Sequence, residues 1–237
     1  MRNKENKRKG ILIVAIIVTL VLSSSVFAKG SDKKKALKAY SKMLSKKELA
    51  IMPIGTWMLH GDGRIYYKKK SKMSSAYFSL AYIDNDNVPE LILKKKENKY
   101  IVFAVYTWKK GKVKRIMYEG SGTYSLYLPS FSGYYMKKGI IRIEWKTSEG
   151  VSIYDRHYKM RGSKPAAEIL YRFQDPDYEY DSDEEDYSGT PDEYRVNKKS
   201  ASRSKYNEAY KKATSGETLR KVKFKKNSGK NRKKYLK

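Results

Sequence analysis

Residues 100–112 read YIVFAVYTWKKGK, a pattern that predicts a buried strand followed by a tight turn. Apolar side chains occupy both the odd-numbered positions from Ile101 to Val105 and the even-numbered positions from Val102 to Tyr106. Because successive side chains of a strand point to opposite faces, neither face of this strand suits water, and we expect it to be central in a sheet. The KKGK that follows contains a glycine able to adopt positive φ, which predicts a hairpin into the next strand.

Similar segments rich in Tyr, Ile and Val, separated by turn signals, extend on both sides of this strand. In IIRIEWK (residues 140–146) the apolar residues after the first alternate with charged ones, which predicts one buried and one wet face. Glycine-containing connections at 137–139 and 161–164 indicate hairpins rather than crossover helices. The expected strands are Arg64–Lys68, Ala76–Ile83, Glu90–Lys94, Tyr100–Trp108, Lys112–Tyr118, Thr123–Leu128, Ile140–Lys146, Val151–Lys159 and Ala166–Phe173.

Helices are expected on both sides of this β-rich region, which covers residues 57–173. Residues 32–48 have apolar side chains at three- and four-residue spacing after a good N-cap, Ser31, which predicts an amphipathic helix. Ser204 can cap a short helix that extends to about Ala213. The expected fold class is therefore α+β: an antiparallel β-meander or partly closed sheet with an N-terminal amphipathic helix and short C-terminal helices.

Residues 1–28 have the parts of a secretory signal peptide: a basic stretch, an apolar run from Ile11 to Leu22, and small residues up to Ala28. We therefore expect residues 29–237 to form a single mature domain outside a Gram-positive cell. The alternative is an uncleaved anchor, and contact with a membrane is expected only in that case. The sequence contains no Cys, which excludes a lipid anchor on cysteine and a disulfide framework.

The chain carries 53 Lys and Arg against 25 Asp and Glu, a formal charge of +28, or +24 without residues 1–28. This excludes an ordinary neutral cytosolic enzyme. The charges are separated into blocks, with an acidic loop over residues 174–194 and a basic segment over residues 195–237. The acidic loop is therefore also a candidate intramolecular mask for the basic end. The predicted polyanion-binding residues are Arg220, Lys221, Lys223, Lys225, Lys226, Lys230, Arg232, Lys233 and Lys234.

One loop has carboxylates in a spacing that resembles a calcium site. Calcium loops place oxygen donors at alternate positions of a tightly wound segment, and Asp84, Asp86 and Glu90 fall at such positions. Tyr82 stands in place of the first carboxylate and Asn87 in place of the usual glycine, although Asn tolerates the left-handed conformation. An Asx-rich turn joining two core strands therefore explains the loop better, and any bound calcium is expected to be weak and structural. No other cofactor is expected.

The same region resembles a known group of proteins. FSLAYIDNDNVPELIL (residues 78–93) and VYTWKKGKV (residues 105–113) are similar to motifs of Tyr/Lys-rich secreted or lipid-anchored proteins of gut clostridia, in which an Asp-rich loop precedes Pro-Glu-Leu. YYMKKG (residues 134–139) and KNSGKNRKKYL (residues 226–236) resemble further motifs of these proteins. The resemblance covers most of the expected mature chain. It implies secretion and a single domain but no activity, because these proteins are largely uncharacterised.

No stretch of the sequence reaches the specificity of a catalytic motif, such as a nucleophile elbow or a zinc-binding His pair. His157 is expected to be an outward strand residue, and the many tyrosines to be packing residues rather than a platform for glycans or single-stranded nucleic acid.

The charge favours a secreted, non-enzymatic binding or envelope-associated module that contacts anionic wall polymers or acidic host glycans. No cytosolic nucleic acid partner is expected. The alternative is a secreted hydrolase of wall or host polymers, which would need a cleft lined by two facing carboxylates on neighbouring strands, for example involving Glu144 or Asp155.

Overall fold

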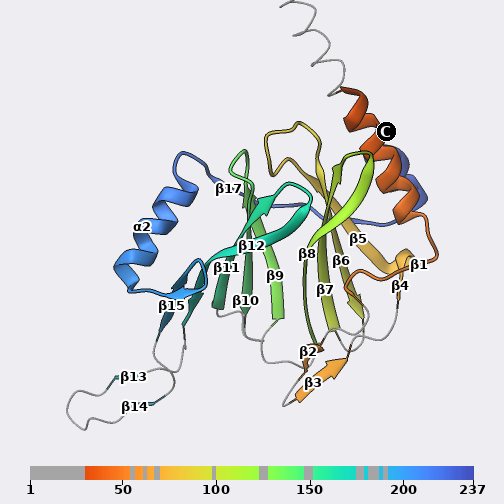
Figure 1. Ribbon diagram of the computed structural model, residues 1–237. Coiled ribbons are helices and arrows are strands. Elements are labelled where there is room, and N and C mark those ends of the chain that lie inside the picture. The colour runs from red at the N-terminus through yellow and green to blue at the C-terminus, as the bar shows by residue number, and fades with distance from the viewer. Residues whose placement is uncertain are drawn as a thin grey trace, which may run out of the picture.

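The computed structural model describes residues 30–53, 57–60, 63–66, 70–97, 100–122, 128–146, 152–174, 179–180, 187–188 and 192–237. Antiparallel strands dominate this part of the chain and form two large open sheets with helices outside them (Figure 1). From left to right in Figure 1 the layers are helix α2, a seven-stranded sheet, a five-stranded sheet and the helix of residues 30–44, here called the N-terminal helix. The expected α+β class is confirmed. The predicted signal peptide, residues 1–28, lies outside the described residues.

The five-stranded sheet has the order β18 (Lys225–Lys226), β5 (Ala76–Ala81), β6 (Glu90–Glu97), β7 (Tyr100–Lys109), β8 (Lys112–Gly122). The seven-stranded sheet has the order β16 (Lys199–Ser200), β15 (Glu193–Val196), β12 (Lys164–Phe173), β11 (Ser152–Arg161), β10 (Ile140–Lys146), β9 (Leu128–Tyr135), β17 (Leu219–Arg220). Short ladders join β1 (Glu48–Leu49) to β4 (Ser71–Lys72), β2 (Trp57–His60) to β3 (Gly63–Tyr66), and β13 (Glu179–Tyr180) to β14 (Tyr187–Ser188). The other elements are η1 (Met73–Ser75), α2 (Arg203–Thr214) and α3 (Gly229–Tyr235).

The five-stranded sheet is buried on both faces, as the sequence of β7 predicts. On one face the even-numbered residues Val102 to Tyr106 pack in a cluster with Tyr40 and Leu44 of the N-terminal helix. On the other face the odd-numbered residues Ile101 to Val105 share a core with Ile141 of the seven-stranded sheet. Each sheet is largely a meander of consecutive strands, so the chain builds one sheet and then the other.

Helix α2 covers part of the outer face of the seven-stranded sheet, whereas β10 keeps the expected partly exposed side, on which the Arg142, Glu144 and Lys146 side chains are 21%, 16% and 39% exposed. Tyr206 of α2 packs with Leu170 of β12 and Tyr194 of β15 in a third cluster. Beneath this helix His157 is completely buried, although it was expected to point to water. The prediction was wrong because the strand pattern gives the face of a residue, whereas the cover on that face comes from a helix about 50 residues later in the sequence.

Strand β9 was not expected, because its sequence LPSFSGYY contains Pro, Gly and Ser, which indicate turns. The strand tolerates them because β10 pairs along one side, whereas β17 pairs on the other side with Tyr134 and Tyr135 only. Gly133 has a φ of +156°, and a Cβ atom there would lie 2.5 Å from the carbonyl oxygen of Arg220. Glycine at this position therefore lets β17 approach β9.

Two helix boundaries and the acidic loop also differ from expectation. The N-terminal helix ends at residue 44 instead of 48, because Glu48 and Leu49 pair with β4. Ser202, not Ser204, caps α2, with its hydroxyl accepting a hydrogen bond from the Lys205 backbone nitrogen. The predicted loop 174–194 ends in β15 and includes the ladder of β13 and β14, while 175–178, 181–186 and 189–191 lie outside the described residues.

None of the helices in the described part of the chain has the length and apolar character needed to cross a membrane.

Candidate functional site

The nine basic residues predicted from the sequence lie on a segment that crosses from one sheet to the other. Arg220 belongs to β17, at the edge of the seven-stranded sheet, whereas Lys225 and Lys226 form β18, at the edge of the five-stranded sheet. Lys221 and Lys223 lie between the two edges. The remaining four residues are on α3: Lys230, Arg232, Lys233 and Lys234. The basic segment is thus folded, and its charges spread along the crossing and the final helix.

The crossing segment, residues 219–226, alternates between core and surface. Val222 and Phe224 pack against the core shared by the two sheets. The lysines on either side of them border a pocket of about 250 Å³. This pocket is lined by Phe78, Ser79, Leu80, Tyr134, Lys221, Val222, Lys223, Lys225 and Tyr235. Because side chains alternate here as in a strand, Lys221, Lys223 and Lys225 lie beside the apolar residues that line the pocket.

Asn227 fastens the final helix to the rest of the fold. Its backbone nitrogen donates to the Ala76 carbonyl at 2.8 Å. Its side-chain nitrogen donates to the carbonyl oxygens of Leu44 and Met73, each at 2.8 Å, and its side-chain oxygen accepts from Arg232 at 2.9 Å. The residue is only 4% exposed, and this fully bonded arrangement ties the C-terminal segment to the end of the N-terminal helix. Asn227 gave no sequence signal beyond its place in the KNSGKNRKKYL motif.

Sequence reasoning missed a set of lysines on the N-terminal helix. Lys34, Lys38 and Lys42 recur at four-residue spacing, which places them on one face of the helix. Together with the end of the chain they line a groove of about 450 Å³, here called the lysine groove. Its lining residues are Lys34, Lys38, Ser41, Lys42, Ser45, Leu236 and Lys237. The spacing was visible in the sequence, but only the fold shows that the N-terminal helix and residues 236–237 meet there.

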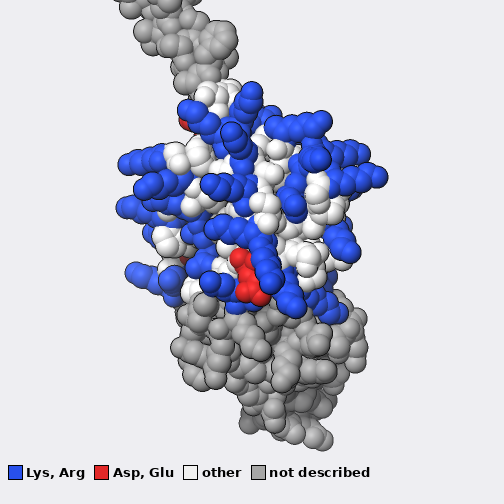
Figure 2. All heavy atoms as spheres, turned by 90° about the vertical axis from the view of Figure 1, so that its right-hand side faces the viewer, with Lys and Arg blue, Asp and Glu red and all other residues white. Residues whose placement is uncertain are grey.

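The lysine groove and the lysines of α3 (Lys230, Lys233 and Lys234) together form what we call the basic face, on the outer side of the five-stranded sheet. Figure 2 shows Lys and Arg side chains over most of the described surface on this side, with little acidic surface among them. Among the residues that the structure describes, none of the basic-face lysines takes part in an ion pair; the pairs found there involve other residues. Strands β13 and β14, which belong to the candidate mask, lie at the opposite end of the molecule in Figure 1.

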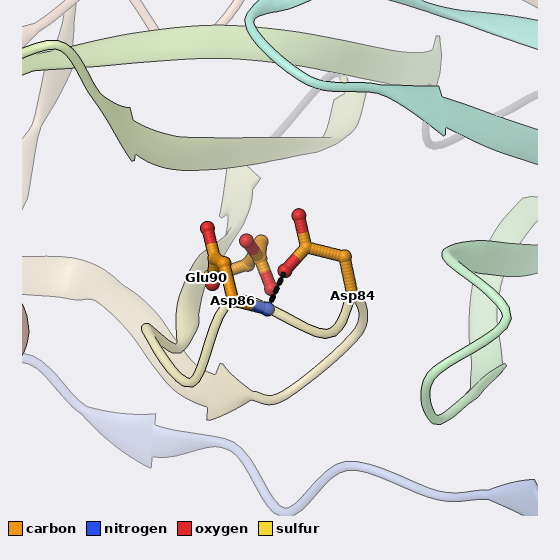
Figure 3. A group of neighbouring side chains, drawn as sticks. All are labelled: Asp84, Asp86 and Glu90. Carbon is orange, nitrogen blue, oxygen red and sulfur yellow. Dashed lines mark hydrogen bonds between the residues drawn. The ribbon is translucent and has the colours of Figure 1, made fainter. Parts of the chain in front are cut away.

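The carboxylates of the predicted calcium loop do converge, as Figure 3 shows. Ligand oxygens of Asp84, Asp86 and Glu90 lie within 4.8 Å of one another. The turn itself is an Asx structure: the Asp84 carboxylate accepts from the Asp86 backbone nitrogen at 3.1 Å, and Asp86 accepts from Val88 at 2.9 Å. Asn87 has a φ of +62°, the left-handed conformation that Asn tolerates.

A lysine ammonium already lies between two of these carboxylates. Lys109 contacts Asp86 closely and Asp84 at 3.3 Å. The pKa of Asp86 is lowered, because hydrogen bonds from Lys109 and the Val88 backbone outweigh the opposing effect of burial. Lys109 therefore supplies the positive charge that a cation would bring to the loop.

Glu90 has a structural role in the same loop. It is completely buried, and its two oxygens hydrogen-bond with the Ile83 backbone nitrogen and the Thr107 hydroxyl, each at 3.1 Å. Burial raises the pKa of Glu90 to about 8, so the carboxyl is largely neutral at pH 7. A neutral carboxyl adds little to calcium affinity, which depends on ligand charge. Calcium binding stays a prediction; a calcium-dependent rise in Tm that Asp84→Asn abolishes would support it.

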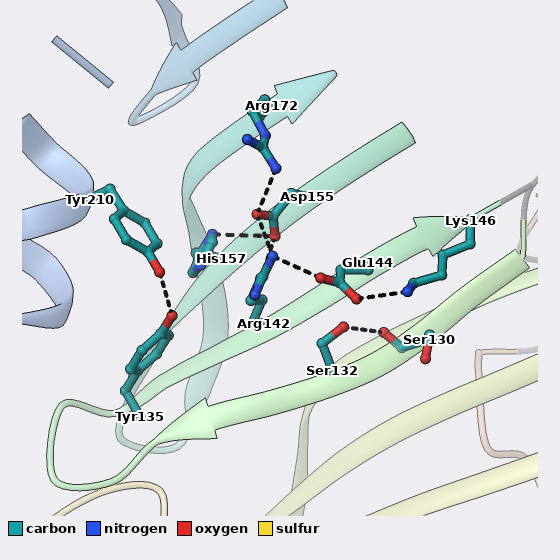
Figure 4. Close-up of polar contacts among 10 residues, drawn as sticks. All are labelled: Ser130, Ser132, Tyr135, Arg142, Glu144, Lys146, Asp155, His157, Arg172 and Tyr210. Carbon is teal, nitrogen blue, oxygen red and sulfur yellow. Dashed lines mark hydrogen bonds and ion pairs between the residues drawn. The ribbon is translucent and has the colours of Figure 1, made fainter. Parts of the chain in front are cut away.

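The facing carboxylates of the hydrolase alternative are neighbours in the structure, but an arginine joins them (Figure 4). Glu144 and Asp155 are paired across β10 and β11. Arg142 lies 2.7 Å from Glu144 and 2.9 Å from Asp155, and Arg172 lies 3.8 Å from Asp155. These four residues and His157, here called the covered cluster, lie together on the seven-stranded sheet, where α2 reaches His157 through Tyr210. The two carboxylates thus act as counter-ions of Arg142, an arrangement suited to stabilising the sheet rather than to general acid–base chemistry.

His157 is the titratable centre of the covered cluster. Its ring stacks on Tyr135 with centroids 6.1 Å apart and meets Tyr210 of α2 edge-on at 5.4 Å. Neither ring nitrogen has a hydrogen-bond partner among the described residues, and the Asp155 carboxylate lies 3.8 Å from Nδ1. Burial lowers the pKa of His157 to about 4, which keeps the imidazole neutral at pH 7.

The tyrosines serve largely as packing residues where their side chains are described. Tyr106, Tyr134 and Tyr135 are buried, whereas Tyr77, Tyr82 and Tyr118 are exposed. No family model, no curated protein and no solved structure matches the chain. The resemblance to secreted clostridial proteins therefore stays a prediction.

Proposed function

We propose that the protein is a secreted, non-enzymatic module that attaches to anionic polymers of the cell envelope, such as a wall polymer, or to acidic host glycans. One observation carries this proposal: the first described helix and the last helix, from opposite ends of the chain, join in a basic face whose lysines have no carboxylate partner among the described residues. A net charge of +28 attracts polyanions over a distance of about one Debye length.

The position of the basic face suits this role. Lys34, Lys38 and Lys42 follow the predicted signal peptide closely in the sequence. If residues 1–28 are removed, the face is free to contact a wall polymer. If they are retained as an anchor, the same lysines are held next to an anionic membrane surface. Both cases place the basic charges against an anionic layer, but only cleavage allows release by salt.

Fractionation of the producing cells tests the proposal. Medium, wall and membrane fractions are probed for the protein, and the wall fraction is washed with increasing salt. The proposal predicts protein in the wall fraction that salt releases steeply, because salt screens the contacts of exposed charges. Retention on the wall that does not respond to salt would overturn it. Protein in a salt-resistant membrane fraction would show an uncleaved anchor.

A further inference from the structure

We infer that the lysine groove binds a linear phosphodiester polymer, whose successive phosphates meet Lys34, Lys38 and Lys42. This inference rests on the proposed function, since it names the class of polyanion and the part of the basic face that recognises it. The groove has a lysine row on one side and the chain end, Leu236 and Lys237, on the other.

Both walls of the groove are held rigidly by the core. On one side Ala36, Tyr40 and Leu44 of the N-terminal helix are each at most 1% exposed. On the other side Leu236 is 6% exposed in the same cluster, and its backbone nitrogen donates to the Arg232 carbonyl at 2.9 Å. The lysine backbones are therefore fixed before a ligand arrives, which lowers the entropic cost of binding.

The row of lysines is unfavourable for the helix itself. Lys34 and Lys38, and Lys38 and Lys42, are like-charge pairs at four-residue spacing, an arrangement that destabilises a helix. In α2, by contrast, Glu208 lies three residues after Lys205 and four residues before Lys212, so opposite charges are adjacent. An uncompensated row on a helix that is otherwise well packed indicates that a ligand supplies the missing negative charge.

The spacing of the row fits a short charged repeat. Residues four apart in a helix are separated by about 6 Å along its axis. A phosphodiester chain with a three-carbon spacer carries one charge per repeat at a similar interval. A glycan with one carboxylate per disaccharide spaces its charges more widely, so it meets fewer of the lysines at once.

The other lining residues also favour a phosphate backbone over a ring-bearing ligand. Among the described residues that line the groove there is no aromatic side chain, so they offer no surface on which sugar rings or bases stack. The Ser41 hydroxyl makes no hydrogen bond to the described residues and is free to donate to a phosphate oxygen, whereas the Ser45 hydroxyl already donates to the Lys42 carbonyl at 2.9 Å. Lysine binds phosphate as a point charge and needs no planar partner.

Two triple variants test the inference by binding to poly(glycerol phosphate) over a range of salt concentrations. K34Q/K38Q/K42Q removes the row and leaves the buried side of its helix intact. K205Q/K211Q/K212Q removes the same number of exposed charges from α2, in the opposite layer, and serves as the matched control. Hyaluronate, with one carboxylate per disaccharide, is the second probe.

At about 0.15 M salt the row variant should lose roughly tenfold in affinity for poly(glycerol phosphate). The slope of log K against log salt should also become shallower by about 2, because each of the three lost lysine–phosphate contacts contributes about 0.7 to that slope. The control should lose less than about threefold, and hyaluronate should bind more weakly than poly(glycerol phosphate) to the unmodified protein. Equal losses in both variants would overturn the groove as the site but leave the proposed function standing. Equal binding and equal sensitivity with hyaluronate would overturn the phosphodiester assignment. If the unmodified protein binds neither probe nor isolated walls, the proposed function fails together with the inference.

Discussion

The two outer faces of the molecule are both partly covered by helices, yet they treat charge in opposite ways. On the seven-stranded sheet, the covered cluster holds Arg142 against Glu144 and Asp155, and Asp155 is 4% exposed. On the basic face, Lys34 and Lys38 are exposed, and the structure describes no carboxylate that pairs with them. Buried charges are paired because an unpaired one costs several kcal/mol, whereas exposed like charges are tolerated at small cost. In the covered cluster each charge thus depends on its partner, whereas the exposed lysines of the basic face are available to a ligand.

The largest expected effect comes from removing Arg142, the ion-pair partner of Glu144 and Asp155. Arg142→Met leaves Asp155 with only Arg172, at 3.8 Å, as a nearby cation. The free energy of unfolding should fall by about 3–4 kcal/mol, since removal of one partner leaves a buried charge uncompensated. Urea denaturation at pH 7 measures it. Lys38→Met is the matched control and should cause no loss of unfolding free energy, because it removes only like-charge pairs; similar losses in both variants would remove the distinction between the faces.

The next effect depends on pH and concerns His157. Its pKa is lowered by burial to about 4, whereas the unfolded chain has an ordinary value of 6.5. Between these values the unfolded state binds more protons, so stability is fully present above pH 6.5 and is lost as pH falls through 4, by about 3 kcal/mol in all.

His157→Phe sharpens this test because it keeps the ring contacts with Tyr135 and Tyr210. The variant should lose this part of the acid destabilisation, as measured by unfolding free energies at pH 4 and pH 7. If the unfolding free energies at pH 4 and pH 7 differ as much in the variant as in the unmodified protein, His157 is not the group that causes this acid destabilisation.

A smaller loss is expected where the basic face is attached. Asn227→Ala removes the bonds to the Leu44 and Met73 carbonyls and leaves these oxygens without their donor. We expect a loss of about 2 kcal/mol in unfolding free energy, because buried polar groups without partners are costly. Native-state hydrogen exchange should show faster exchange in α3 than in α2. Uniform exchange across both helices would argue against a specific role of Asn227 in holding the final helix.

The smallest effect is a gain in stability. Lys38→Gln removes two like-charge pairs, with Lys34 and Lys42, and should raise the unfolding free energy by about 0.5 kcal/mol at low salt. Thermal unfolding at low and high salt measures it, and the gain should disappear at high salt, where repulsion is screened. A loss of stability at low salt would mean that Lys38 makes a favourable contact that outweighs its repulsion by Lys34 and Lys42.

The sequence predicted the fold where pattern alone determines it. The double apolar pattern of residues 101–106 predicted a central strand, and the alternation of β10 gave the correct inward residues. It could not show that α2 covers His157, because that contact joins residues about 50 positions apart. Turn-forming residues hid β9, whose Gly133 is explained only by the approach of β17.

Only part of the candidate site could be predicted from the sequence. The C-terminal basic residues were evident from composition, and the Asx turn at Asp84 followed from its residue types. The row Lys34, Lys38 and Lys42 had a readable spacing, yet its meaning depends on Leu236 and Lys237 lying across the groove. Contacts between the two ends of a chain are set by tertiary packing, and a single sequence contains no local signal for them.

Elution from isolated cell walls in a salt gradient tests the division between paired and unpaired charge most directly. The unmodified protein, K34Q/K38Q/K42Q and Arg142→Met are compared at a temperature at which all three are folded. The account predicts that Arg142→Met elutes with the unmodified protein despite its lower stability, and that the row variant elutes at clearly lower salt. Elution of the row variant together with the unmodified protein, or retention that salt does not affect, would contradict it.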